Sequence, residues 1–320
     1  MSTELQVFIL FICAFVISVC GMPLVIPLLR KLKFGQTVRN VGPETHLVKN
    51  GTPTMGGIVF VVGFMLTILV SIFNHTEFIP VTLMTVLFGL VGFIDDFIKV
   101  KKKQSEGLKA WQKMGLQIVF TGAVLAYMYF ATDISMNIII PFTNGFEINL
   151  GIFVILFDFL VILGTDTGAN FTDGLDGLCT KVSLVILVFM FFVAIKQESS
   201  LILPIAAFAG SLLAFLVFNA YPAKVFMGDT GALAIGGFIS ICAIQLRIPL
   251  FLIIIAFIYV AEVGSVMMQV SYFKLTHGKR IFKMTPIHHH FEKCGWKETK
   301  VVTVFTIVTI ILCSIAYLGV

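Results

Sequence analysis

Acidic side chains stand at three places where an apolar run of the chain meets a polar one. They are Asp95 and Asp96 after one run, Asp173 and Asp176 before a second, and Asp229 before a third. Two adjacent carboxylates at a helix C-terminus repel each other and the helix dipole, so a cation should compensate them. Oxygen ligands gathered at one depth suit Mg²⁺, usually with phosphate completing its shell. These acids therefore predict a site for Mg²⁺ and a phosphate.

Each acidic group also has a plainer structural interpretation. Lys99 and the lysines at 101–103 would neutralise Asp95 and Asp96 at a membrane interface. Thr172 or Asp173 would cap the following helix, and Asp229 would cap its own. Capping does not account for Asn170 or Asn219, which accompany these acids, or for the glycines around them. The sequence therefore favours a ligand site over caps alone.

Two further segments offer groups that contact anions. After Lys49, the run Gly51-Thr52-Pro53-Thr54-Met55-Gly56-Gly57 combines glycines and hydroxyls and could cradle a phosphate, although no strand precedes it. The second segment is His288-His289-His290, which lies in an amphipathic stretch. Its imidazoles favour anion contact. A zinc site with Cys294 is the lesser alternative, because consecutive residues rarely bind one tetrahedral ion.

The elements that carry these residues are predicted to be membrane helices. Of 320 residues, 58% are hydrophobic and 12% are charged, whereas a soluble domain has about 25% charged residues. This composition excludes a soluble globule, a disordered chain and a disulfide-stapled module. Hydropathy predicts ten spans, at about 5–29, 54–73, 79–98, 112–131, 150–165, 178–195, 201–218, 231–246, 250–273 and 299–318. We expect an all-α integral membrane protein with one polytopic domain over 1–320.

The distribution of basic residues predicts the orientation of these spans. Twenty of the 22 Lys and Arg residues fall in alternate gaps or within four residues of them. By the positive-inside rule these gaps are cytoplasmic loops, at about 30–53, 99–111, 166–177, 219–230 and 274–298, and both termini lie outside. On the outer side, alternating apolar residues around Asn144-Gly145 predict a small β-hairpin near 134–150. All candidate acids then lie at the cytoplasmic edge, and Gln269 lies in a span just before a basic loop.

Taken together, the motifs resemble the phospho-N-acetylmuramoyl-pentapeptide transferase (MraY) family, a bacterial branch of the polyprenyl-phosphate N-acetylhexosamine-1-phosphate transferases. The resemblance covers nearly the whole chain, and its most specific parts are Asp173-Gly174-Leu175-Asp176-Gly177-Leu178 and His288-His289-His290. It implies a ten-helix enzyme of the bacterial inner (plasma) membrane, often a homodimer, with its active site on the cytoplasmic face. The implied reaction transfers phospho-MurNAc-pentapeptide from UDP-MurNAc-pentapeptide to undecaprenyl phosphate with Mg²⁺, giving lipid I and UMP. Membrane lipid is an expected partner, and nucleic acid is not.

The resemblance also implies roles for single residues. The expected catalytic residues are Asp95, Asp96, Asp229 and His288, with Asp229 as the metal ligand. The expected substrate-binding residues are Lys49, Thr54, Lys103, Asn170, Asp173, Asp176, Asn219, Phe226, Gln269 and His289.

The residues suit this chemistry independently of the resemblance. Attack of a lipid phosphate on a diphosphate gathers negative charge, so a metal ion and lysines are natural catalysts. We favour direct displacement, with Asp95 or Asp96 orienting or deprotonating the lipid phosphate, and a covalent aspartyl-phosphate remains the alternative. A sibling enzyme acting on UDP-GlcNAc is the nearest rival function. A cation-coupled transporter is a more distant one, since it would need acids near the membrane midplane.

Overall fold

The fold is a helical bundle with one small sheet. A computed structural model describes residues 2–31, 51–72, 75–102, 104, 106–132 and 134–320. Its longer helices are α1 (Thr3–Lys31), α2 (Gly57–Ile72), α3 (Ile79–Lys102), α4 (Ala110–Ala131), α5 (Phe153–Thr172), α6 (Leu178–Lys196), α7 (Ile202–Asn219), α8 (Gly228–Gln245), α10 (Phe257–Leu275) and α12 (Glu298–Tyr317). Shorter elements are η2 (Thr76–Phe78), η3 (Pro249–Phe251), α9 (Leu252–Ile255), α11 (Ile287–Lys293), β1 (Asn137–Ile139) and β2 (Glu147–Asn149).

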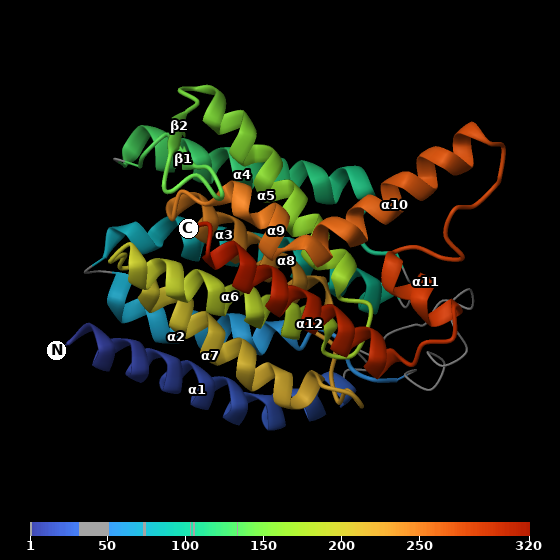
Figure 1. The fold of residues 1–320 in the computed structure, drawn as a ribbon. Helices are drawn as coiled ribbons and strands as arrows, with labels where there is room; N and C mark the ends of the chain where they lie inside the picture. The colour runs from blue at the N-terminus through green and yellow to red at the C-terminus, as the bar shows by residue number, and fades with distance from the viewer. Residues whose placement is uncertain (1, 32–50, 73–74, 103, 105, 133) are drawn as a thin grey trace.

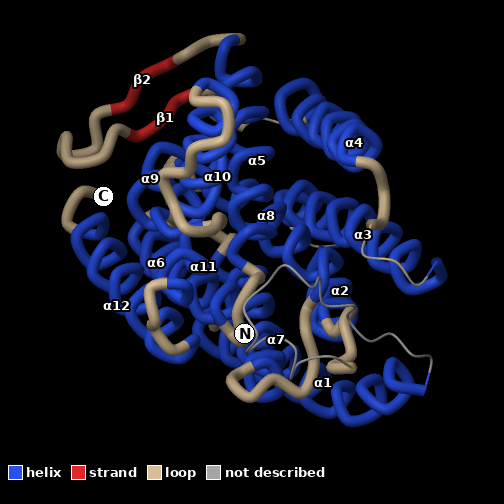
Figure 2. The backbone as a smooth tube through the Cα atoms, turned by 90° about the vertical axis from the view of Figure 1, so that its right-hand side faces the viewer, coloured by secondary structure: helices blue, strands red, loops and turns tan. Residues whose placement is uncertain are grey.

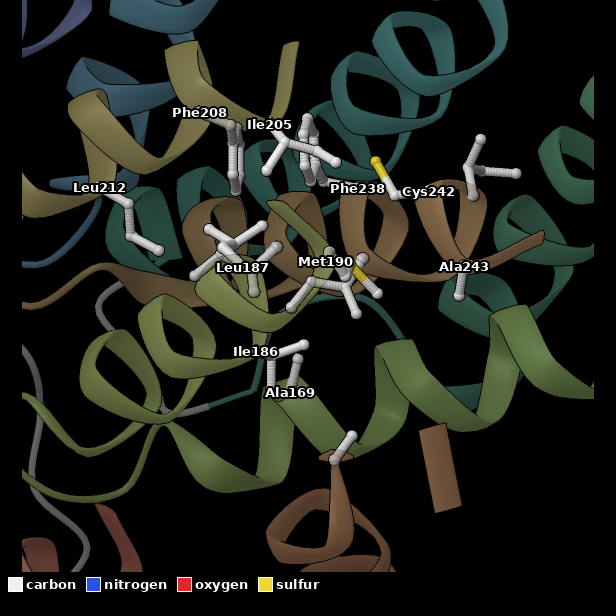
Figure 3. Packing of buried hydrophobic residues seen from close by; sticks show 14 of the residues in the cluster. Ala169, Ile186, Leu187, Met190, Ile205, Phe208, Leu212, Phe238, Cys242 and Ala243 are labelled. Atoms are coloured by element: carbon white, nitrogen blue, oxygen red, sulfur yellow. The ribbon is translucent and has the colours of Figure 1, made fainter. Parts of the chain in front are cut away.

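Helix α8 forms the centre of the bundle, as the end-on view of Figure 2 shows, and packs against α2, α3 and α5. Its small residues allow this close packing. Aromatic rings also join α7 to α8. Phe208 of α7 stacks on Phe238 of α8, with ring centroids 4.0 Å apart. Figure 3 shows this pair above Leu187 and Met190 of α6. The packed core therefore holds α8 in a fixed position against its neighbours.

The two ends of the bundle differ. In Figure 1 the N- and C-termini and the β-hairpin lie at the left, whereas α11 lies at the right. The hairpin is antiparallel, with Ile138 opposite Ile148, and Asn144 and Gly145 both have positive φ (55° and 79°). This confirms the predicted hairpin and its Asn-Gly turn. Arg247 fastens the hairpin through an ion pair of 2.5 Å to Glu147.

The prediction of several membrane-spanning helices is confirmed, but the predicted number of ten is not. Among the described residues, eight helices are long and apolar enough to cross a membrane, and a bent pair makes a ninth candidate. Helix α2 is apolar but contributes only a shorter stretch, Gly57–Leu69. The predicted span 250–273 is not one straight helix, because it is broken between α9 and α10 with a bend of 80°. Breaks of this kind carry no hydropathy signal, so the sequence does not predict them.

Helix α5 also differs from the prediction, because it continues to Thr172 instead of ending near 165. Its last turns carry Thr165, Asp166 and Asn170 and therefore have the composition of a loop. In the bundle Thr165 and Asp166 are buried and Asp166 is hydrogen-bonded to another helix. Tertiary packing thus makes a polar segment helical.

Candidate active site

Three of the predicted acids form one cluster. Asp95 and Asp96 lie in the last turns of α3, and Asp229 lies in the first turn of α8. Ligand oxygens of the three carboxylates lie within 4.8 Å of one another. Asp95 and Asp96 are each only 3% exposed. The close packing of α3 against α8 therefore brings together acids that are more than a hundred positions apart.

Two lysines compensate part of this negative charge. Lys99 Nζ lies 2.5 Å from Asp95 Oδ2, 2.8 Å from Asp229 Oδ2 and 3.6 Å from Asp96 Oδ1. Lys113 Nζ, from α4, lies 2.8 Å from Asp229 Oδ2. The expected pairing of Lys99 with Asp95 and Asp96 is confirmed, but the same lysine also contacts Asp229. Two ammonium groups facing three carboxylates leave the cluster net negative when all are ionised.

Hydrogen bonds fix the orientation of each carboxylate. Asp96 Oδ2 accepts hydrogen bonds from Thr230 N at 3.0 Å and Thr230 Oγ1 at 2.9 Å. Asp95 Oδ1 accepts one from Leu108 N at 2.7 Å. Asn170 Nδ2, near the end of α5, donates to Asp229 Oδ1 at 3.0 Å. Asp229 makes no side-chain cap of α8, so the capping interpretation of this residue is wrong.

Glycines let the surrounding backbone approach the cluster. A Cβ atom on Gly92 would lie 2.2 Å from the carbonyl oxygen of Asp229, so α3 and α8 touch at this point. A Cβ atom on Gly228 would lie 2.5 Å from Asp96 Oδ2 and 2.9 Å from Thr54 Oγ1. Thr54 therefore stands next to the cluster, as expected for a residue at the site.

The glycines at 56 and 57 do not cradle a phosphate. Gly56 N donates to Phe226 O at 2.9 Å, and Gly57 N donates to Met227 O at 3.0 Å. A Cβ atom on Gly57 would lie 2.4 Å from Gly231 Cα. Their small size thus serves the packing of this loop against the start of α8. The backbone N–H groups of these two glycines are already used, so they would not donate to a phosphate, and a phosphate contact by the rest of the loop stays a prediction.

Asp173 and Asp176 lie in a turn, not on one face of a helix. Helix α6 begins only at Leu178, behind Gly177 at φ +72°. Asp176 Oδ2 accepts a hydrogen bond from Ala223 N at 2.9 Å, and Asp176 N donates to Glu298 at 2.7 Å. The turn is thereby tied to the loop before α8 and to α12.

Two of the predicted binding residues hold loops in place. Asn219 accepts a hydrogen bond from Thr180 Oγ1 at 2.8 Å and donates to Val225 O at 3.0 Å. Gln269 Oε1 accepts hydrogen bonds from Ile281 N and Phe282 N, both at 3.0 Å. These contacts shape the segments 219–226 and 276–286. Phe226 lies in the first of them and is partly buried.

The three histidines point to three different partners. His288 Nδ1 lies 3.0 Å from Glu262 Oε1 of α10, without the alignment of a hydrogen bond. His289 Nδ1 lies 2.8 Å from Glu292 Oε2, and His290 Nδ1 accepts a hydrogen bond from Lys283 N at 3.1 Å. His290 Nε2 also lies 3.7 Å from Cys294 Sγ, but among the described residues no metal-binding group of three or more includes these rings, so the zinc alternative lacks the ligands it needs.

His288 joins α11 to the turn before α6. Its side chain is 1% exposed, and Glu262 is completely buried. A Cβ atom on Gly174 would lie 2.2 Å from His288 Nε2, so the ring lies directly against the turn that contains Asp173 and Asp176. Asn170 links this region to the carboxylate cluster, because its backbone oxygen accepts a hydrogen bond from Asp173 N and its side chain donates one to Asp229.

The sequence predicts most of this site but not all of it. Lys49 and Lys103 lie outside the described residues. The sequence predicts Lys99 beside Asp95 and Asp96 but not its contact with Asp229, and it predicts no role for Lys113, which also contacts Asp229. The signals were present: Lys99 follows Asp95 at i+4, and Lys113 lies within the first turn of an apolar helix, where a charge is costly without a function.

The arrangement suits a divalent cation and a phosphate. Three hard carboxylate oxygens converge, and the side chain already nearest to all three is itself a cation, Lys99. Hard oxygen donors of this kind are what Mg²⁺ prefers. A phosphate oxyanion would be attracted by the ammonium groups of Lys99 and Lys113. The donor set therefore fits a metal-assisted reaction on phosphate.

Comparison with known proteins agrees with this chemistry. Residues 78–247 match the family model described as "Glycosyl transferase family 4", and residues 49–61 match "Phospho-N-acetylmuramoyl-pentapeptide-transferase signature 1". A phospho-N-acetylmuramoyl-pentapeptide-transferase of Clostridium perfringens is 47% identical over 96% of this chain and 96% of its own length. The protein of the same name from Clostridioides difficile is 46% identical over 96% and 95%.

The first family match covers more than half of the chain, from η2 to the end of α8, and includes all three clustered aspartates. The relatives match from end to end and share one name. The chain therefore belongs to glycosyl transferase family 4 and, within it, to the phospho-N-acetylmuramoyl-pentapeptide transferases, which are bacterial membrane phospho-sugar transferases.

Proposed function

We propose that this protein transfers phospho-MurNAc-pentapeptide from UDP-MurNAc-pentapeptide to undecaprenyl phosphate, giving lipid I and UMP. The observation that carries the proposal is the cluster of Asp95, Asp96 and Asp229 with two lysines, in a chain that matches transferases of this name over 96% of its length. Both phosphate partners are anions, and the chain offers carboxylates for a metal ion and ammonium groups for phosphate at the same place.

Mg²⁺ is the proposed cofactor. Asp229 would hold it, with Asp95 and Asp96 beside it, since these three carboxylates are the convergent oxygen donors of the described chain. When bound, the ion would neutralise charge on the diphosphate and polarise its phosphorus. Asn170 and Thr230 keep the carboxylates oriented toward the centre of the cluster by the hydrogen bonds at Asp229 and Asp96.

Side chains of the protein would bind the phosphates and orient the nucleophile. Lys99 and Lys113 attract the phosphates and offset the charge that collects as the nucleophile approaches. Asp95 or Asp96 orients the lipid phosphate or removes its proton. A lipid phosphate is already ionised near neutral pH, so we favour direct displacement over an aspartyl-phosphate intermediate.

The nucleotide substrate is proposed to lie along the loops between the cluster and α11. The proposed binding residues are Lys49, Thr54, Lys103, Asn170, Asp173, Asp176, Asn219, Phe226, Gln269 and His289, with His288 at the diphosphate or sugar. Asn219 and Gln269 are engaged with backbone groups, so we assign them to shaping the pocket. Thr54 and Asn170 adjoin the carboxylates, so we assign them to the phosphate end.

The finer topology also remains our proposal. We propose ten crossings in one polytopic domain, with α2 and the bent α9–α10 pair counted as spans. Both termini and the hairpin would lie outside, and the carboxylate cluster would face the cytoplasm, where a UDP-linked substrate is made available. We further propose a homodimer, which the mass of the detergent-solubilised protein tests.

Activity is tested with purified protein in detergent. UDP-MurNAc-pentapeptide, a polyprenyl phosphate and Mg²⁺ should give UMP and a lipid-linked product, EDTA should stop the reaction, and UDP-GlcNAc should not replace the substrate. Asp229→Asn should lower turnover at least about a hundredfold. Glu106→Gln, at an exposed acid of the neighbouring loop, is the matched control and should retain activity. Monodisperse protein that releases no UMP would refute the assignment.

A further inference from the structure

A second polar contact joins the helices that carry the site, and the proposed reaction does not use it. Gln117 Nε2 of α4 donates a hydrogen bond to Asp166 Oδ2 of α5. Gln117 is 5% exposed and Asp166 is completely buried. Among the described residues, Asp166 Oδ1 has no hydrogen-bond partner. Burying a carboxyl group inside a bundle is costly, so this pair calls for an explanation.

Gln117 and Asp166 lie on the same helix faces as two residues that contact the carboxylate cluster. Gln117 follows Lys113 by four residues on α4, and Asp166 precedes Asn170 by four residues on α5. Residues four apart share one face of a helix. Lys113 and Asn170 approach Asp229 through its two different oxygens. The bond between Gln117 and Asp166 therefore joins the same two helix faces one turn away from the site.

Helix α8 also contacts this pair, through Gly236. A Cβ atom on Gly236 would lie 2.4 Å from Asp166 Cα, so α8 touches α5 at the residue that makes the bond. Gly236 follows Asp229 by seven residues, which is about two helical turns and the same face. The distance between α5 and α8 is thus fixed at Asp166, and the rotation of α4 is fixed by Gln117.

We infer that Asp166 and Gln117 are positioning residues, whose hydrogen bond sets the register of α4 against α5 so that Lys113 and Asn170 both meet Asp229. This inference deepens the proposed function and rests on it for its effect on turnover. The role needs an acceptor at position 166 and a donor at position 117, but no charge. Asparagine at 166 would accept the same bond, whereas alanine would not.

The first test measures the exposure of Lys113 and needs neither substrate nor metal. Amine-reactive labelling in EDTA, quantified by peptide mass spectrometry, should modify Lys113 slowly because it is ion-paired and mostly buried. Asp166→Ala and Gln117→Leu should each raise its labelling rate about threefold to tenfold. Asp166→Asn should restore a rate close to that of the unchanged protein. Exposed Lys101 serves as the internal reference.

The matched control is another buried bond between the same two helices. Tyr129 OH of α4 donates to Asp158 Oδ2 of α5 at 2.5 Å, about 12 Å along the helix from Asp166. Asp158→Ala should lower thermal stability as Asp166→Ala does, yet it should leave Lys113 labelling and turnover nearly unchanged. Equal effects of the two alanine variants on Lys113 labelling would show that the Asp166 bond serves only stability, and would overturn the inference.

The second test measures turnover. Asp166→Ala and Gln117→Leu should lower kcat about tenfold to a hundredfold, as expected for misplaced catalytic groups, while KM for the UDP substrate changes less than about twofold. The double variant should be no worse than either single variant. Additive losses, or no rescue by Asp166→Asn, would contradict the inference. If the unchanged protein released no UMP but Lys113 labelling followed the expected pattern, the proposed function would fail and the positioning role would stand.

Discussion

At the scale of single residues, the site is a balance of opposite charges at a helix junction. Asp229 is the centre, because it contacts both lysines through Oδ2 and Asn170 through Oδ1. An unpaired carboxylate cluster would be unstable at the edge of a bilayer. The lysines therefore stabilise the cluster in the absence of a ligand, and in the proposed reaction the same charges would attract the phosphates of the substrates.

Lys113 is the lysine whose role is most sharply testable. Lys113→Gln removes the ammonium group at 2.8 Å from Asp229. We expect it to lower kcat about a hundredfold to a thousandfold, since in the proposed reaction this charge would meet the reacting phosphates. UMP release under saturating substrate measures this effect. Lys101→Gln, at an exposed position near the end of α3, should stay within about twofold of normal. Similar losses in both variants would argue for a general effect of charge.

A second prediction at the scale of residues concerns Gly174, which lies against His288. Gly174→Ala places a methyl group 2.2 Å from His288 Nε2, so it should push the ring away from the turn and lower kcat at least about tenfold. Gly164→Ala, with nothing within 4 Å of the added Cβ, should leave turnover and melting temperature nearly unchanged. Normal turnover of Gly174→Ala would remove His288 from the site.

At the scale of elements, the site depends on how closely α3 and α2 approach α8. Gly92 of α3 lies against the backbone of Asp229, and Gly57 of α2 lies against Gly231. Small residues permit such approaches, which give membrane helices much of their association energy. The carboxylates of α3 and α8 therefore meet because of these contacts and not through any property of the acids themselves.

Gly92→Ala tests this dependence. The new Cβ would lie 2.2 Å from Asp229 O, and neither backbone can yield without separating the helices. We expect about 1–3 kcal/mol of destabilisation, measured as a lower melting temperature in detergent, together with loss of UMP release. Gly115→Ala on α4, with no atom within 4 Å, is the matched control and should behave like the unchanged protein. Full activity of Gly92→Ala would contradict the tight α3–α8 contact.

At the scale of the whole molecule, the two ends of the bundle hold different structural elements. One end holds both termini and the hairpin, and the other holds α11 (Figure 1). Twenty of the 22 basic residues lie in or close to alternate gaps between the apolar runs, and this asymmetry is why we propose that the α11 end faces the cytoplasm. In that orientation, a lipid phosphate and a water-soluble nucleotide could both reach the acids at that edge.

Orientation is tested by labelling single cysteines in intact cells. In a background where exposed Cys13, Cys20 and Cys294 are replaced by alanine, Thr143→Cys in the hairpin should react with a membrane-impermeant maleimide. Lys279→Cys, after α10, should react only when the cells are permeabilised. Both positions are exposed, so burial does not explain a difference between them. The opposite labelling pattern would invert the proposed topology.

Features that are local along the chain were predictable from the sequence. Hydropathy predicted the helices, and the Asn-Gly pair predicted the hairpin turn. The acids at the edges of apolar runs predicted a metal and phosphate site, but this pattern did not separate Asp95, Asp96 and Asp229, which cluster, from Asp173 and Asp176, which lie in a turn. The resemblance to a family added the substrates and the individual roles. These properties depend on composition and spacing within about twenty residues, which is the length of one membrane crossing.

Only the tertiary structure decided which distant groups meet. It placed Lys113 on Asp229, bound Gln117 to Asp166, turned three adjacent histidines toward three partners and assigned Gly57 to packing. It also made the polar end of α5 helical by burying it. The physical reason is that each of these contacts joins different helices, whose register and separation follow from close packing of small side chains, and no local pattern of the sequence records that packing.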